Sequence, residues 1–207
     1  MLTYRLAGLL MAAATLLAAP ACNDDDFFID EEEPTGGGGG GGGGATDDLL
    51  RLDGPNTTGP EVAGGLHRFG VQFFPEDLAD FDGRALTGAQ IFIGEVPTSL
   101  LIEVWRGGET VPGGLPVASV QVSSGIDDIA LNDFAFDAPV VITDDDFLWI
   151  TAEVEVPGGV GRPIGCDAGP NVEGGDWLWS TDRWEPYLDR TGGRESVNWN
   201  IRGIVGE

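Results

Sequence analysis

Residues 148–156 read LWITAEVEV, and this stretch decides the fold. Apolar side chains occupy every second position, at Leu148, Ile150, Ala152, Val154 and Val156, whereas Glu153 and Glu155 lie between them. Successive side chains of a β-strand point to opposite faces of its sheet, so this alternation is typical of a strand with one face in the core. The stretch therefore predicts a half-buried antiparallel strand.

The same period of two recurs on both sides of this stretch. It is present in residues 67–73, 100–106, 118–122, 134–142 and 197–205, and Gly, Pro and Asp turn signals separate these runs. A short helix is expected only at residues 75–81, where Pro75 and Glu76 stand at the start. Many short strands without a helical layer predict an all-β fold, an antiparallel β-sandwich of the jelly-roll type, over residues 51–207.

The first residues are typical of an export signal. Arg5 precedes a weakly apolar run at residues 6–17, which is too short to span a bilayer comfortably. Small residues lead up to Cys22, so this segment resembles a lipobox, in which cleavage precedes a lipid-bearing cysteine. Ala19 departs from that pattern, which prefers Leu, Val or Ile at this position, and plain secretion is the alternative. We expect a lipoprotein signal peptide at residues 1–21 and lipidation of Cys22.

The segment between Cys22 and the domain has the composition of a disordered tether. Seven of the eleven residues at 23–33 are Asp or Glu, and residues 36–44 are nine consecutive glycines. Ordering such a run costs the maximum backbone entropy. We therefore expect residues 22–50 to form an acidic and glycine-rich linker with a typical reach of roughly 30 Å.

The charge of the chain limits its partners. The formal net charge is −25, with 10 Lys and Arg residues against 35 Asp and Glu residues. Such a chain repels phosphate backbones, so nucleic-acid binding is not expected. Solubility accounts for most of this acidity, and divalent cations would also suit it.

Catalytic and metal sites have little support in the sequence. His67 shares a face with Phe69 and is expected to be a core or edge residue, and Cys166 is expected to be a small buried side chain. Apart from Cys22, the chain has one His and one Cys, which are too few ligands for a zinc site. No metal site and no cofactor are therefore predicted. A structural calcium ion is the exception that the composition permits. Its candidate loops are residues 166–176, with Asp167, Asn171, Glu173 and Asp176, and the three aspartates at 144–146.

Aromatic residues gather in the last third of the chain. Trp177 and Trp179 share a face at strand spacing and are expected to belong to the core. Trp184 and Tyr187 stand in an irregular stretch among charged residues and are the predicted ligand-binding platform. Aromatic rings at such positions stack on sugars or anchor protein interfaces.

The order of the motifs resembles the β-sandwich modules related to cleaved-adhesin domains of bacterial surface proteases and haemagglutinins. The resemblance covers nearly all of residues 65–205 and is carried by the segments FPEDL at 74–78, DGRALT at 82–87, IEVWRGG at 102–108, DFLWI at 146–150, GCDAGP at 165–170, GDW at 175–177 and NWNIR at 198–202. Such modules are similar to galactose-binding-like jelly rolls. The resemblance implies adhesion or accessory binding without catalysis, and it transfers no ligand-binding motif.

Together these features predict a non-enzymatic lipoprotein of the bacterial cell envelope, held by its lipid in the outer membrane or at the cell surface. Its domain is expected to be an adhesion module that binds a carbohydrate or a protein. The alternative is a purely structural module of an envelope assembly with no small ligand, and an enzyme lacks a recognisable catalytic set.

Overall fold

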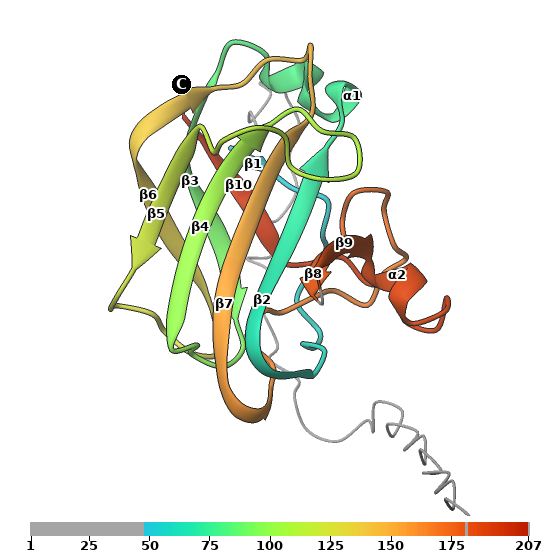
Figure 1. Ribbon diagram of the computed structural model, residues 1–207. Coiled ribbons are helices and arrows are strands. Elements are labelled where there is room, and N and C mark those ends of the chain that lie inside the picture. Colours follow the sequence, from blue (N-terminus) through green and yellow to red (C-terminus); the bar gives the residue numbers. More distant parts are fainter. Residues whose placement is uncertain (1–47, 181, 207) are drawn as a thin grey trace, which may run out of the picture.

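The computed structural model describes residues 48–180 and 182–206 (Figure 1). The expected signal peptide, Cys22 and the tether up to residue 47 lie outside the described residues. Within the described part, no helix has the length and apolar character needed to cross a membrane.

Two antiparallel sheets pack face to face and confirm the predicted β-sandwich (Figure 1). One sheet has the order β1 (Leu49–Leu50), β10 (Ile201–Gly206), β3 (Ala85–Ile93) and β6 (Ala130–Val141). The other has the order β5 (Ala118–Val122), β4 (Ser99–Arg106), β7 (Leu148–Gly161), β2 (Val62–Phe73), β8 (Trp177–Ser180) and β9 (Arg183–Pro186). Two short helices complete the fold, α1 (Pro75–Leu78), at the predicted position, and α2 (Tyr187–Arg190).

The core lies between the sheets and uses the alternating residues of each strand. The apolar positions of β7 are buried as predicted, and the ring of Phe69 on β2 meets Trp199 edge to face with ring centroids 5.2 Å apart. Ile91 of β3 and Ile102 of β4 are fully buried from the opposite sheets. Burial of these side chains is the main favourable contribution to folding.

Two boundaries differ from the sequence prediction. The strand β1 begins at Leu49 and pairs with β10, so the last two residues of the segment that we assigned to the tether belong to the sandwich. The last strand begins at Ile201, whereas the period of two starts at residue 197. The residues before it form hydrogen bonds with loops: Trp199 N donates to Gly175 O, and Asn200 N donates to Gly165 O.

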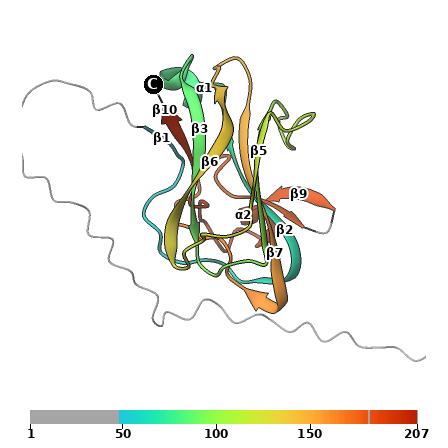
Figure 2. The same ribbon diagram turned by 90° about the vertical axis from the view of Figure 1, so that its left-hand side faces the viewer.

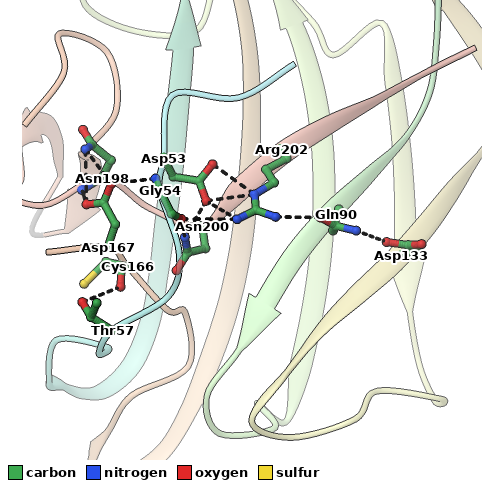
Figure 3. A network of polar contacts seen from close by, with 10 residues as sticks. All are labelled: Asp53, Gly54, Thr57, Gln90, Asp133, Cys166, Asp167, Asn198, Asn200 and Arg202. Carbon is green, nitrogen blue, oxygen red and sulfur yellow. Dashed lines mark hydrogen bonds and ion pairs between the residues drawn. The ribbon is translucent and has the colours of Figure 1, made fainter. Parts of the chain in front are cut away.

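A buried polar network joins the first described residues to the last strand (Figure 3). Arg202 of β10 forms an ion pair with Asp53, with 2.8 Å between Nη2 and Oδ2, and their side chains are 6% and 0% exposed. Asn200 donates to Gly54 O at 3.0 Å. Arg202 also donates to Gln90 Oε1 on β3, so the network reaches across the outer face of the four-stranded sheet.

The same network fixes the loop that leads to β8. The Asp167 carboxylate accepts hydrogen bonds from Gly54 N at 2.9 Å and from Asn198 N at 2.8 Å. The side-chain amide of Asn198 donates to the same carboxylate, and Cys166 N donates to Thr58 O at 2.7 Å. Three segments distant in the sequence are thus held together by polar contacts that are buried or partly buried.

Asp53→Ala is expected to lower the free energy of unfolding by about 3–5 kcal/mol, because it leaves the Arg202 guanidinium buried and uncompensated. Asp48→Ala provides the control, since Asp48 pairs with Arg84 at 2.9 Å but its side chain is 70% exposed. We expect this control to cost about 1 kcal/mol or less. Urea denaturation measures both values, and equal losses would show that the buried pair contributes no more than the exposed one.

Candidate functional site

Tryptophan side chains cover the outer face of the six-stranded sheet. Because Phe69, Val71 and Phe73 of β2 point into the core, their neighbours Arg68, Gly70 and Gln72 point outward. The register of the sheet places the other outward residues beside them. They include Trp105 on β4, Trp149 on β7, Trp177 and Trp179 on β8, and Trp184 on β9.

Trp149 is the centre of this layer and is fully buried although it faces outward. Its ring centroid lies 5.2 Å from that of Trp177 and 5.9 Å from that of Trp184. Its indole Nε1 donates to Gly108 O at 2.9 Å in the β4–β5 loop. The β8–β9 hairpin stands off the outer side of the sheet and supplies this cover (Figure 2).

The absence of a side chain at Gly70 allows the Trp184 ring to pack directly on the sheet. A Cβ atom at this position would lie 3.1 Å from Trp184 Cζ3 and 3.3 Å from Cη2. A glycine in the interior of a strand often marks such a close approach. Trp184 is therefore packed on the surface of β2, where it is half-buried.

Polar groups separate the half-buried indoles. Trp105 Nε1 donates to Thr151 Oγ1 at 3.1 Å. The Arg68 guanidinium lies 4.8 Å from the centroid of the Trp179 ring, and its Nε donates to Glu153 Oε2 at 2.5 Å. We call the surface formed by Trp105, Trp179, Trp184, Arg68, Glu103 and Glu153 the aromatic face.

Glu103 lies among these groups in a partly desolvated position. Burial raises the pKa of the Glu103 carboxyl above its ordinary value. The nearby Arg68 opposes this change in pKa, and the like charge of Glu153 adds to it. The aromatic face thus combines indole surfaces, hydrogen-bond acceptors and one guanidinium donor. This set of groups can stack on the apolar side of a sugar ring and bond to its hydroxyl groups.

The two residues predicted as a platform are separated by the structure. Trp184 lies on the aromatic face, whereas Tyr187 is 8% exposed, so its expected exposure was wrong. Tyr187 begins α2, its ring packs 5.2 Å from Trp199, and its hydroxyl donates to Glu195 Oε2 at 3.0 Å. It stabilises the core beneath the hairpin.

Trp177 and Trp179 share a face as predicted, but the assignment of that face to the core was wrong. Leu178 between them is buried at 2% exposure and pairs with Phe69, so the two indoles point outward. Sequence reasoning also did not select Trp105, Arg68 or Glu103 as site residues. The alternation in residues 100–106 carried the relevant signal, because it places Trp105 and Glu103 on the face opposite Ile102 and Val104.

Carboxylates of both candidate calcium loops are engaged in hydrogen bonds within the protein. Among the described residues, no group of three or more His, Cys, Asp or Glu side chains could hold a metal ion. Both Asp167 oxygens accept N–H hydrogen bonds from the polar network. In the second loop, Asp145 accepts from Thr143 Oγ1 and Asp146 accepts from Phe147 N. These carboxylates therefore order the loops through their own hydrogen bonds.

His67 and Cys166 take the positions that the sequence predicts. His67 is half-buried on the core-side face of β2, and its Nε2 lies 2.7 Å from Ala63 O. Cys166 is fully buried within the core cluster. Neither residue lies on the aromatic face.

Comparison with known proteins leaves the chain without an assigned family. No protein-family model matches it, and no curated protein matches it. Two solved structures resemble it, each with a TM-score of 0.49 and 10% identity over 70% of this chain. They are the cysteine protease and lectin-like domains of Cwp84, a surface-layer-associated protein of Clostridium difficile, and a variant of the clostridial cysteine protease Cwp84 after propeptide cleavage. The chain spans 33% and 37% of their lengths. A likeness at this level carries no argument about ligand or activity.

Asp176 lies beside the aromatic face in a position that penalises its charge. It is 2% exposed at the end of the loop before β8, and its Oδ2 accepts from Leu188 N at 2.7 Å. Burial raises the pKa of the Asp176 carboxyl above 3.8, although this hydrogen bond and one from Asn171 oppose the change. The folded state therefore favours the protonated carboxyl, so stability is lost as the pH rises through the folded pKa.

Asp176→Asn is expected to raise the melting temperature at about pH 7, because the amide is neutral and keeps an acceptor for Leu188 N. The gain should shrink as the pH falls through the raised pKa of the folded protein and vanish below the ordinary aspartate value of 3.8, where the carboxyl is neutral in both the folded and the unfolded state. Thermal unfolding followed by circular dichroism across this range measures it. Asp137→Asn, on an exposed site of β6, is the control. A gain that does not change with pH would contradict the assignment.

Proposed function

We propose that the chain is a non-enzymatic binding module of the cell envelope and that its aromatic face binds a glycan. One observation carries the proposal: three half-buried indoles, of Trp105, Trp179 and Trp184, lie outside the core on one sheet. A soluble domain rarely leaves such rings together on its surface without a partner.

The rings are held in place before any ligand arrives. Trp184 rests on Gly70, Trp179 lies under Arg68, and Trp105 bonds to Thr151. Rings ordered in this way lose little conformational freedom on binding, which favours affinity. The rings stand on several strands of one sheet, so they are suited to a ligand that extends across the strands.

Charge narrows the class of glycan. Two of the polar groups on the aromatic face are carboxylates, and only Arg68 is cationic among the six residues that define it. The chain as a whole carries a net charge of −25. Sulfated and uronate-rich polymers are repelled by such a protein. We therefore infer that the ligand is a neutral or amine-bearing glycan.

Trp184→Ala is expected to weaken glycan binding at least about tenfold, since a buried aromatic contact at the centre of an interface commonly contributes 2 kcal/mol or more. A glycan array identifies the ligand, and isothermal titration calorimetry compares the variant with the wild type. Val141→Ala is the control, because Val141 is 54% exposed on β6 in the other sheet. Failure of the wild type to bind any glycan, or unchanged binding by Trp184→Ala, would refute the proposal.

The anchoring of the module is a second part of the proposal. We infer that Cys22 carries lipid, supported by the apolar run at residues 6–17, the small residues before Cys22 and the acidic residues after it. Each buried methylene contributes about 0.8 kcal/mol, so two or three acyl chains hold a protein stably on a membrane.

Cys22→Ala is expected to move the protein from the membrane fraction to the soluble fraction, because the substitution removes the site of lipid attachment. Fractionation of cells followed by immunoblotting measures this change. Cys166→Ala is the matched control and should leave the protein in the membrane fraction, since Cys166 is buried inside the domain. A Cys22→Ala protein that remains with the membrane would exclude lipid anchoring.

A further inference from the structure

A pocket of about 550 Å³ opens next to the aromatic face. Four carboxylates from three separate segments line it. Glu109 lies on the β4–β5 loop, Glu173 and Asp176 precede β8, and Asp189 belongs to α2. Gln72 of β2 and Trp177 of β8 complete the wall nearest the sheet. The volume is within the range of pockets that hold small organic ligands.

The aromatic wall of the pocket is fixed. Trp177 Nε1 donates to Gln72 Oε1 at 3.1 Å, and the Trp177 ring packs against Trp149. Gln72 is 1% exposed and donates to Glu109 O at 2.9 Å, so it also holds the opposite loop. Both walls are therefore held by the same buried amide.

The deepest carboxylate, that of Asp176, has no cationic partner among the described residues. Asp53, which is also buried, is neutralised by Arg202, but none of the ion pairs among the described residues includes Asp176. Burial of an ionised group without an opposite charge costs free energy. A cation bound in the pocket would remove this cost.

An organic cation fits these walls better than a metal ion. The carboxylates are spread around the pocket, and no group among the described residues could hold a metal ion. An indole ring is the best aromatic partner for an ammonium group. A tryptophan wall with separated carboxylates therefore suits an ammonium group carried on a molecule about the size of a sugar.

We propose that this acidic pocket binds the free amino group of a hexosamine unit in the glycan that occupies the aromatic face. The inference rests on the proposed function. Trp177 connects the pocket with the aromatic face. It lines the pocket, and its ring packs on Trp149, which also contacts Trp184. A chain lying on the aromatic face would therefore reach the pocket without leaving the protein surface.

The test compares a glucosamine pentamer with its fully N-acetylated counterpart by calorimetry at mildly acidic pH. The wild type is expected to bind the amine form about tenfold more tightly, because only the charged amine can form charge-assisted hydrogen bonds with the pocket carboxylates. Asp176→Asn combined with Glu173→Gln should abolish this preference and leave the affinity for the N-acetylated form unchanged. A preference that persists in this double variant, or is absent from the wild type, would overturn the proposal.

A charge-matched control excludes a general electrostatic effect. Asp128→Asn combined with Asp137→Asn removes two exposed carboxylates, one in the loop before β6 and one on β6. This variant should preserve the preference for the amine form. If both double variants lose the preference equally, the net charge causes it and the pocket assignment is wrong.

A pocket-only probe separates failure of this inference from failure of the proposed function. Glucosamine monosaccharide should shift the indole N–H resonance of Trp177 in ¹⁵N NMR spectra, even in a Trp184→Ala background that has lost glycan binding. No shift at saturating glucosamine would refute the pocket. Lysine amide is the comparison amine, and equal affinity for it would show that the pocket does not select a sugar.

Discussion

The buried ion pair between Asp53 and Arg202 is the contact on which the arrangement of the whole domain depends. It fixes the first described segment against the last strand, over a sequence separation of 149 residues. The adjoining contacts of Asp167 with Gly54 and Asn198 extend this connection to the loop before β8. Neither carboxylate can lose its partners without leaving unsatisfied groups in a buried environment.

The aromatic face is supported from behind by this network. Trp199 lies in the core directly after Asn198, and its indole Nε1 donates to Trp177 O at 2.8 Å. The ring of Trp199 also contacts Phe69 of β2, whose neighbour Gly70 carries Trp184. The position of the outward indoles is therefore set by the core residues on the other side of the same strands, through contacts that span the sheet.

The sequence was sufficient for the fold class because alternation is a local property. It predicted the strand around Ile150, the helical turn at Pro75 and the burial of Cys166. It could not decide which face Trp177 and Trp179 share, because alternation relates neighbours without identifying the core side. That choice depends on the pairing of Leu178 with Phe69, a contact between distant segments. Gly70 was a readable signal for close approach, but its partner Trp184 lies more than a hundred residues away.

Tyr187 illustrates the opposite error. Its charged sequence neighbours suggested exposure, yet α2 turns its ring toward Trp199. Short irregular segments have no period from which burial can be inferred, so packing alone decides their orientation. The acidic pocket escaped sequence reasoning for a related reason, since its four carboxylates come from three separate segments.

The pairing of β1 with β10 places the N-terminal end of the described domain on the four-stranded sheet, opposite the sheet that carries the aromatic face. Leu49 lies opposite Ile204 at the margin of the four-stranded sheet, whereas the indoles lie on the outer side of the six-stranded sheet. Figure 2 shows β1 and β9 on opposite sides of the sandwich. A domain held by the residues before Leu49 would thus turn its aromatic side away from its attachment. Many copies attached to one surface could engage a single polymer at several points, with avidity beyond that of any one copy.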